Sequence, residues 1–189
     1  NTDVGVDISA ATLQAAYDAI VLCGGSTIPR DLNIPGRDLE GVHFAMDFLE
    51  QSNRRVAGDP LTPEEAIVAT RKQVMVIGGG DTGSDCVGTA NRQGAKSVQQ
   101  IELLAKPPLS RAAETPWPLW PMQLRTSSSH EEGCDRKWAL LTKAFLGDQH
   151  GQLRDIEVVK VEWGIPAEGG NARLQEIPGT PQEIPCELA

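Results

Sequence analysis

The sequence predicts a three-layer α/β fold around a parallel sheet, with a β-meander added to it. Aromatic residues make up only 4% of the 189 residues, so the core is mostly aliphatic, as in strands that are covered on both faces. An apolar run at 73–77 is followed by a glycine-rich turn, a helical stretch and a second run at 97–104, which is the pattern of a β-α-β unit. Apolar residues then alternate along 144–180, which predicts the meander.

Charge and hydropathy exclude several classes of function. The formal net charge of −9 would repel phosphate backbones and anionic lipid, so we expect no nucleic-acid partner and no membrane partner. The longest uninterrupted apolar run, at 19–23, is far shorter than the roughly 18 residues of a membrane span, and no secretion signal is visible. The four cysteines form no C-x-x-C pair and no metal-ligand spacing, so we expect reduced thiols and a cytoplasmic protein.

Short elements and connectors alternate before residue 73. Tyr17–Cys23 is apolar, partly β-branched and followed by two glycines, which predicts a buried strand. Apolar residues at helical spacing predict a helix over 41–52. Thr62 is a candidate N-cap for a further helix that ends near Thr70, with Pro63 and two glutamates in its first turn.

The β-α-β unit has the clearest pattern in the chain. Its first strand is QVMVI at 73–77, and Gly94 is placed to end the following helix in the usual C-cap manner. Its second strand covers 97–104. The two strands are expected to be parallel because a helix crosses between them.

The second half of the chain predicts a long loop and then strands. Residues 105–138 are rich in proline and polar residues, so we expect no regular structure there; the Trp-Pro cluster at 116–121 is either a packed flap or a strip for partner docking. A hairpin is expected over 144–163, with a third strand near 173–177.

The chemistry is concentrated in the turn after the first strand of the β-α-β unit. The turn consists of Gly78, Gly79, Gly80, Asp81, Thr82 and Gly83. Its G-x-G-x-x-G pattern provides a tight turn, a close backbone approach to a pyrophosphate and close packing of helix on strand. Amides at the helix N-terminus then meet the phosphate charge. The pattern predicts a Rossmann-like dinucleotide site; the alternative is a glycine-rich turn with no ligand.

Three residues bear on which dinucleotide is bound. Glu102 lies at the end of the second strand, where a carboxylate accepts hydrogen bonds from a ribose 2′-OH and repels a 2′-phosphate. This favours NAD(H). Lys106 and Arg111 follow closely and would pair with a 2′-phosphate if the loop folds back, so NADP(H) stays open.

Other candidate sites are weaker. His130, Glu131 and Glu132 are adjacent, whereas metal ligands on a helix need a spacing of three or four residues, so a solvated loop is favoured over a metal site. Cys86 lies on the inward face of the predicted helix with no histidine placed to activate it, which favours a packing role over a nucleophile.

Several blocks of sequence together resemble one family. They are YDAIVLCGGSTIPRDLNIPGRDLEGVHFAMDFL, VMVIGGGDTGSDCVGTANRQGAKSVQQIELL, PWPLWP and HEEG. These blocks are similar to the NAD(P)H-binding region of the small (β) subunit of glutamate synthase and its relatives, over nearly the whole chain. Within them Gly78, Gly80, Asp81, Thr82 and Gly83 match the family's coenzyme loop. Glu102 matches its ribose-end position.

The resemblance implies an activity for the intact protein. Such subunits are flavoproteins in which hydride passes from NAD(P)H to FAD, and electrons then pass through iron–sulfur centres to a large (α) subunit that forms glutamate. The intact protein would therefore be an NAD(P)H-dependent oxidoreductase, with the large subunit or an equivalent electron acceptor as its partner. Some relatives carry consecutive arginines where this chain has ELLAKPP, which counts against NADPH.

The resemblance also implies that the chain is a fragment. Residues 1–30 would be a remnant of an FAD-binding domain, 31–180 the NAD(P)H-binding domain, and 181–189 the start of the return to the FAD-binding domain. No FAD-type glycine pattern lies in 1–72 and no cysteine-rich cluster region is seen, so FAD and the iron–sulfur cluster are expected only in the intact subunit. The alternatives are the same module in a ferredoxin-coupled or dihydropyrimidine dehydrogenase-like flavoprotein, and a non-catalytic binding or assembly module.

Overall fold

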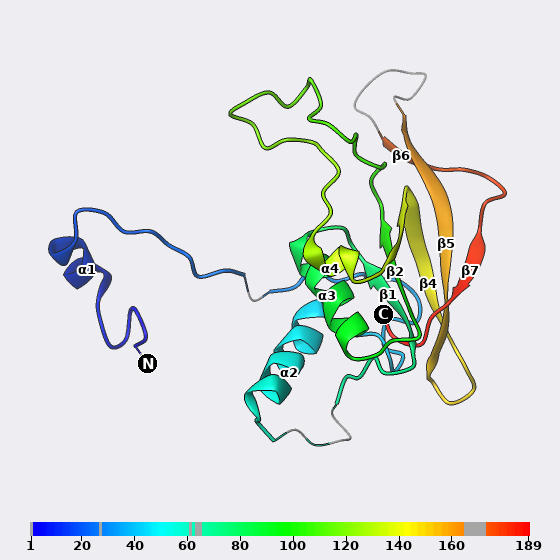
Figure 1. Ribbon diagram of the computed structural model, residues 1–189, viewed down its shortest axis with the longest axis horizontal. Coiled ribbons are helices and arrows are strands. Elements are labelled where there is room, and N and C mark those ends of the chain that lie inside the picture. The colour runs from blue at the N-terminus through cyan, green and yellow to red at the C-terminus, as the bar shows by residue number, and fades with distance from the viewer. Residues whose placement is uncertain (1, 27, 61, 63–65, 165–172) are drawn as a thin grey trace. The chain divides into compact units, whose positions relative to one another are not determined.

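The computed structural model describes residues 2–26, 28–60, 62, 66–164 and 173–189. The chain divides into two compact units, Asn1–Asp31 and Leu32–Ala189 (Figure 1). All of the buried apolar residues that form the described core lie in the second unit. The second unit therefore positions the predicted site.

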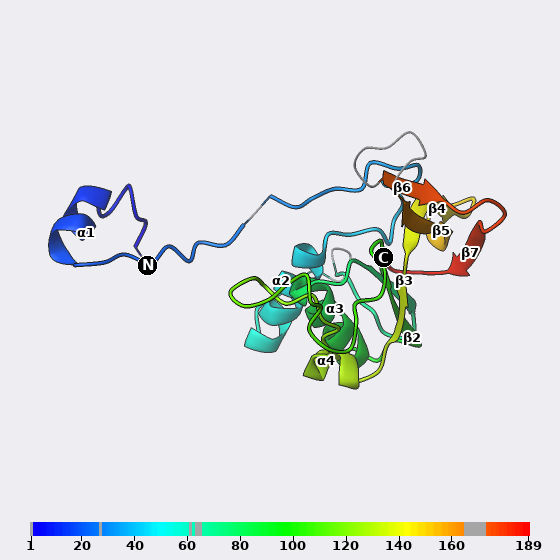
Figure 2. The ribbon, with the colours of Figure 1, turned by 90° about the horizontal axis from the view of Figure 1, so that it is seen from above.

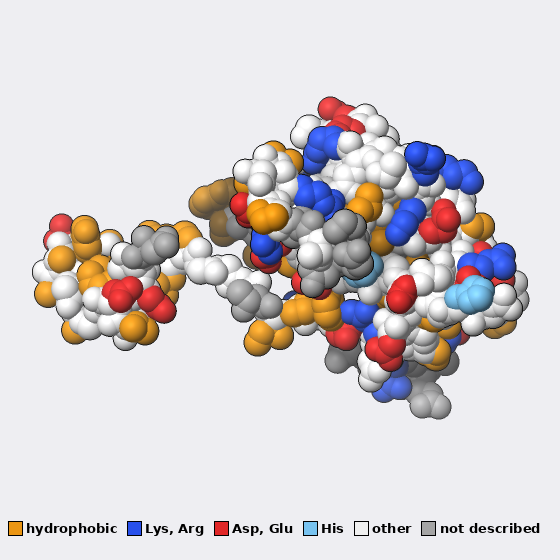
Figure 3. Space-filling view, turned by 90° about the horizontal axis from the view of Figure 1, so that it is seen from below, with side chains coloured by type: hydrophobic (Ala, Val, Ile, Leu, Met, Phe, Trp, Pro, Cys, Tyr) orange, Lys and Arg blue, Asp and Glu red, His pale blue; other side chains and the backbone are white. Residues whose placement is uncertain are grey.

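Among its described residues, the first unit contains one short helix and no buried side chain. Helix α1 (Ala10–Ala16) begins at Ser9, whose hydroxyl accepts a 3.0 Å hydrogen bond from the Thr12 amide. The strand predicted at Tyr17–Cys23 is wrong: this segment is irregular, and Val21 and Leu22 are 83% and 91% exposed. An apolar run becomes a strand only where another strand bonds its backbone, and the described residues provide no such partner. Apolar side chains accordingly spread over the surface of this unit (Figure 3).

Helix α2 (Ala45–Ala57) corresponds to the helix predicted at 41–52. It begins four residues later and ends at Gly58, which adopts φ 86. Part of the next predicted helix, including Pro63, lies outside the described residues, and its described part, 66–69, is not helical. Side chains of neighbouring helices and turns bond these amides instead: the Ile67 and Ala69 amides donate to glutamine side chains at 3.0 and 2.9 Å.

Three parallel strands form the central layer of the second unit, in the order β1 (Gln73–Ile77), β2 (Ser97–Glu102) and β3 (Asp135–Trp138). Helix α3 (Asp81–Arg92) connects β1 to β2, and Gly94 follows its end with φ 78, as predicted. The strand β2 ends two residues earlier than expected.

Regular structure within 105–138 contradicts the prediction for that segment. It contains α4 (Ser128–Glu131) as well as β3. The sequence of β3 is DRKW, so this last strand of the sheet lacks the apolar run that identifies a buried strand. The helix α4 has only four residues and therefore no measurable periodicity.

An antiparallel sheet forms the third layer. Its strands are β4 (Leu140–Gly147), β5 (Leu153–Gly164), β6 (Arg173–Glu176) and β7 (Gln182–Pro185). The predicted hairpin and third strand are confirmed, because β4 and β6 both pair antiparallel with β5. The strand β7, which also pairs with β5, was not predicted.

Figure 2 shows the helices, the parallel sheet and the antiparallel sheet as layers, and two apolar clusters hold these layers together. Val74, Val76 and Val98 face the helices and pack with Phe48 and Val87. The opposite face of the parallel sheet packs on the antiparallel sheet through a second cluster that includes Met75, Ile101, Ile156 and Val158. A three-layer α/β arrangement with helices, a parallel sheet and an added meander is thus confirmed.

The end of the chain returns to the parallel sheet. Leu188 is buried and forms a parallel bridge with Val74, and the Met75 amide donates to the Leu188 carbonyl at 2.8 Å. Ala189 is held by Gly41 and His43: its amide donates to the Gly41 carbonyl, and its carbonyl accepts from the His43 amide, both at 2.8 Å. Segments far apart in sequence thus lie side by side here.

Candidate functional site

The predicted glycine turn lies where β1 ends and α3 begins, and strand β2 holds its first two residues. Gly78 adopts φ 119, which favours glycine, and its amide donates to the Ile101 carbonyl at 2.9 Å. Its carbonyl accepts from Gln100 Nε2 at 2.9 Å. The Gly79 amide donates to Glu102 Oε2 at 2.6 Å. Three successive residues of β2 therefore fix the Gly78 amide and both polar groups of the peptide that joins Gly78 to Gly79.

The second half of the turn is left open. Gly80 is the N-cap residue of α3, and no side chain caps the helix. A Cβ atom added at Gly80 would meet nothing within 4 Å, and Asp81 and Thr82 are exposed. Since α3 is twelve residues long, its uncapped amides and dipole favour an anion at this end. The space over Gly80 and these amides together fit the pyrophosphate of a dinucleotide.

The third glycine of the pattern is required by packing. A Cβ at Gly83 would lie 2.6 Å from the Gly78 carbonyl oxygen and 3.1 Å from Gln100 Nε2. No L side chain fits at that distance without moving backbone. The close approach of α3 to the turn, expected for this glycine, is therefore present.

Glu102 lies at the end of β2, beside the turn, as predicted. Its carboxylate already accepts from the Gly79 amide and, at 3.3 Å, from the Leu104 amide. A carboxylate has about four lone-pair sites, so it can hold these amides and still accept from a ribose hydroxyl.

The two predicted cations lie in different surroundings. Trp138 stands opposite Glu102 in the register of β2 and β3, and the Lys106 ammonium lies 4.9 Å from its ring centroid. Arg136 contacts the same indole at 5.2 Å. Arg111 instead donates to the Thr115 carbonyl at 3.2 Å within its own loop. Lys106 is thus brought to the Glu102 edge, and Arg111 is engaged elsewhere.

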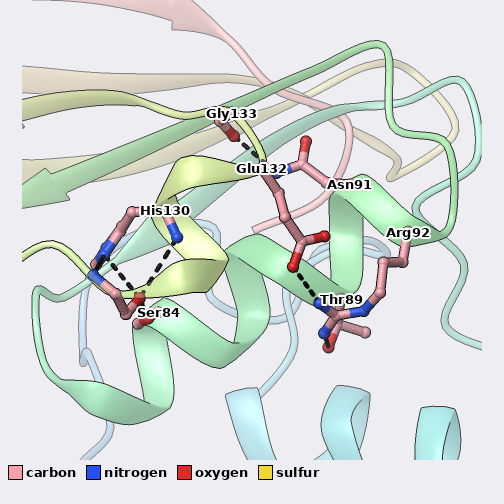
Figure 4. A network of polar contacts seen from close by, with 8 residues as sticks. Ser84, Thr89, Asn91, Arg92, His130, Glu132 and Gly133 are labelled. Atoms are coloured by element: carbon pink, nitrogen blue, oxygen red, sulfur yellow. Dashed lines mark hydrogen bonds and ion pairs between the residues drawn. The ribbon is translucent and has the colours of Figure 1, made fainter.

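A polar network connects the turn to α4, and Figure 4 shows its part between α3 and α4, where Ser84 and His130 lie close together. Gln100 is 2% exposed, and its Oε1 lies 2.9 Å from His130 Nε2. His130 Nδ1 accepts from the Ser127 amide at 3.2 Å, and the Ser127 hydroxyl bonds to that of Ser84 on α3. Burial and the positive charge of Arg136 lower the pKa of His130. His130 is therefore part of a bonded network rather than a solvated loop.

Two contacts hold α4 against α3 beside this network. Arg92 pairs with Glu132, and Asn91 Nδ2 donates to the Gly133 carbonyl at 2.7 Å. The Glu132 carboxylate is therefore paired with the Arg92 guanidinium of α3. In the part of the chain that the structure describes, no three His, Cys, Asp or Glu side chains are grouped to hold a metal ion.

Cys86 is a packing residue, as the sequence favoured. It lies in the core between the helices and the parallel sheet, and burial raises its pKa to about 12. A thiol with that pKa is protonated at neutral pH and is a poor nucleophile.

Two residues of the site were not predicted from the sequence. Gln100 was detectable, because it shares the inward face of β2 with Val98, and a polar residue on a buried face needs a hydrogen-bond partner. Trp138 gave no usable signal, because its strand lacks an apolar pattern. Among the described residues, no helix has the length and apolar character needed to cross a bilayer.

Comparison with known proteins finds glutamate synthases among the relatives of this chain. The chain is 53% identical over 179 residues to the glutamate synthase [NADPH] small chain of Mycobacterium tuberculosis, covering 92% of this chain and 37% of that protein. It is 39% identical to the corresponding chain of Bacillus subtilis, covering 100% of this chain and 39% of that protein. It is 43% identical to the glutamate synthase [NADH] of Schizosaccharomyces pombe, covering 100% of this chain and 9% of that protein. The chain thus spans less than half the length of these relatives, and the resemblance noted in the sequence is confirmed.

A solved structure shares the fold. Mycobacterium tuberculosis FprA in complex with NADPH superposes with a TM-score of 0.59 at 17% identity, covering 100% of this chain and 52% of that chain. The model of the family described as pyridine nucleotide-disulphide oxidoreductase matches residues 3–115. With the glycine turn, the parallel sheet and these matches in place, the chain belongs to the pyridine nucleotide-disulphide oxidoreductase family.

Proposed function

We propose that this chain is the coenzyme-binding part of a glutamate synthase small subunit, where it holds NAD(P)H for hydride transfer to FAD. The observation that carries the proposal is the turn from Gly78 to Gly83, whose first residues are fixed by β2 while Gly80 has open space beside it and α3 has no side-chain cap. The similarity to glutamate synthase small chains supports this assignment.

The residues of the chain act by binding and orientation. The α3 N-terminus holds the pyrophosphate, and the space over Gly80 lets the backbone approach it. Glu102 accepts from the adenosine ribose while it keeps the turn in place. The coenzyme supplies the hydride, so the protein needs no acid, base or nucleophile of its own for that transfer.

The intact protein would contain further parts. In this proposal 31–180 is the NAD(P)H-binding domain, and 1–30 and 181–189 belong with an FAD-binding domain. FAD and an iron–sulfur cluster would be held in the intact subunit, which passes electrons to the large subunit in the cytoplasm. The four cysteines, none of them in a disulfide, fit a reducing compartment.

Coenzyme binding is tested by a substitution that fills the open space. Gly80 has φ −78, which any residue adopts, so Gly80→Val should fold and abolish binding by occupying the pyrophosphate position. Calorimetric titration with NAD⁺ and NADP⁺ measures this loss. Gly24→Val is the matched control, because Gly24 also has no neighbour within 4 Å and should bind as the parent chain does. Unchanged affinity in Gly80→Val would refute the placement.

The choice of coenzyme is tested at Glu102. Glu102→Gln removes the negative charge but keeps an oxygen that accepts from the Gly79 amide, so the turn should stay in place. We expect affinity for NADP⁺ to rise relative to NAD⁺ in this variant, because the repulsion of the 2′-phosphate is gone while Lys106 remains nearby. An unchanged ratio of the two dissociation constants would show that Glu102 does not face the ribose.

A further inference from the structure

We propose that His130 is a positioning residue for the coenzyme turn, acting through Gln100, and that it supports the turn only as the neutral imidazole. The proposal rests on the proposed coenzyme site, because the turn that His130 supports is the one assigned to the pyrophosphate. His130 lies on α4 and Gln100 on β2, and neither is proposed to contact the coenzyme itself.

The orientation of the Gln100 amide follows from its partners. The Gly78 carbonyl can only accept, so the group 2.9 Å from it must be the NH₂ of Gln100. The Gln100 oxygen therefore faces His130 Nε2, also at 2.9 Å, and this oxygen can only accept. If the Gln100 amide were flipped, both hydrogen bonds would be lost. This would be costly, because the side chain is only 2% exposed.

The protonation of His130 follows in turn. Nε2 must carry a hydrogen to donate to Gln100, and Nδ1 must be bare to accept from the Ser127 amide. The network thus specifies the neutral tautomer with hydrogen on Nε2. A proton added at Nδ1 would face the Ser127 N–H and end that bond. The imidazolium keeps its Nε2 hydrogen, but its Nδ1–H must turn from the Ser127 amide to the Ser127 hydroxyl, 3.0 Å away, so the ring and its contact with Gln100 shift.

The charged groups around His130 favour the same state. Arg136 of β3 is the cation that lowers its pKa, together with burial. On α4 itself, Glu131 is exposed, and Glu132 is paired with Arg92 of α3. The facing residue from β2, Gln100, carries no charge.

The turn has little freedom to compensate for a lost support. The Gly78 carbonyl lies between the Gln100 amide and Gly83, where there is no space for an added Cβ. If Gln100 shifts, this carbonyl loses its donor, and the adjoining amides of Gly79 and Gly80 shift with the peptide. The coenzyme should therefore bind less tightly when His130 is protonated.

The proposal is tested by the pH dependence of coenzyme affinity. The dissociation constant of NADP⁺ should be constant above pH 6.5 and should rise as the pH falls below it. The rise should reach about two- to tenfold once His130 is protonated, which corresponds to the net free energy of one hydrogen bond. In His130→Gln, whose amide NH₂ can donate to Gln100 but does not titrate, the His130 component of this rise should disappear. His43→Gln is the matched control, because His43 also has a pKa lowered by burial but bonds to Ala189 through its backbone, and it should keep the full rise.

A measurement without coenzyme separates this proposal from the proposed function. In ¹⁵N NMR of the free chain, His130 should show the Nε2–H tautomer, and the Gly79 amide resonance should follow the titration of His130. In His130→Gln that dependence should vanish. A Gly79 amide that ignores the His130 titration, or an unchanged affinity profile in His130→Gln, would overturn the positioning role. Failure of NAD⁺ and NADP⁺ to bind at pH 7.5 would overturn the proposed function, and the NMR titration would still decide the role of His130.

A second variant excludes a general loss of structure. Gln100→Met removes the link while keeping a side chain of similar length, so affinity should be low at every pH and its His130-dependent change should be absent. A Gln100→Met variant that binds as tightly as the parent chain, with the parent's pH profile, would refute the link.

Discussion

At the residue scale, the turn separates glycines required by packing from glycines required by a ligand. Gly83 has no space for a side chain in the free protein, whereas Gly80 has open space around it. The two positions look equivalent in the sequence pattern. Only the structure shows that one is limited by the protein itself and the other would be limited by what binds.

Gly83→Ala should therefore destabilise the free protein. The added Cβ would lie 2.6 Å from the Gly78 carbonyl oxygen, which belongs to backbone and cannot rotate away. Overpacking of this kind costs about 1–3 kcal/mol, and the helix propensity gained by alanine offsets only about 1 kcal/mol of it. Thermal unfolding should show a lower Tm than in Thr82→Ala, an exposed neighbour in the same helix. Equal Tm values would mean that α3 does not approach the turn this closely.

Gln100 shows what the sequence could and could not predict about the site. The glycines, Glu102 and Lys106 were assigned to one edge of the sheet by spacing alone, and they lie together there. The link from Gln100 to His130 was not assigned, because it joins residues 30 positions apart in sequence whose contact depends on how α4 packs on α3. Arg111 was expected at the coenzyme only if its loop folds back, and its side chain donates to the Thr115 carbonyl within that loop.

At the element scale, a helix or strand could be predicted from the sequence only where its apolar residues form a clear pattern. The strand β1 was predicted from its continuous apolar run, and the hairpin of β4 and β5 from apolar residues that alternate along the chain. The strand β3 was missed because its four residues are mostly charged. Tyr17–Cys23 has the composition of a strand without a described neighbour to pair with, so composition alone was misleading.

The short return to β1 should contribute strongly to stability. Leu188 is 4% exposed and packs in the core beneath the helices. Leu188→Ala should lower the free energy of unfolding by about 2–4 kcal/mol through lost burial and the cavity that remains. Urea unfolding measures this difference, and Leu119→Ala, at a side chain that is 55% exposed, is the control with little expected change. A loss below about 1 kcal/mol would indicate that this segment detaches from the sheet in solution.

At the scale of the whole molecule, the described core and the candidate coenzyme site lie in the same unit. Every residue of the two apolar clusters has a number above 31, and so has every residue of the glycine turn. The first unit contributes no buried side chain from its helix. The second unit therefore has the burial needed to fold without the first.

We expect a chain of residues 32–189 to keep its fold and its coenzyme affinity. Its thermal unfolding should remain cooperative, and calorimetry should give dissociation constants for NAD⁺ and NADP⁺ within about twofold of the longer chain, because no residue of the candidate site is removed. A large loss of affinity would show that residues 1–31 contribute to the site.

The hydrogen bonds that join Ala189 to Gly41 and His43 bring two distant positions to neighbouring-strand spacing, roughly 4.8 Å. The chain from Gly41 to Ala189 thus begins and ends at adjacent positions. A domain closed in this way can be inserted into a loop of another domain with little distortion. The two residues of that domain that flank the insertion need to lie only about one strand spacing apart.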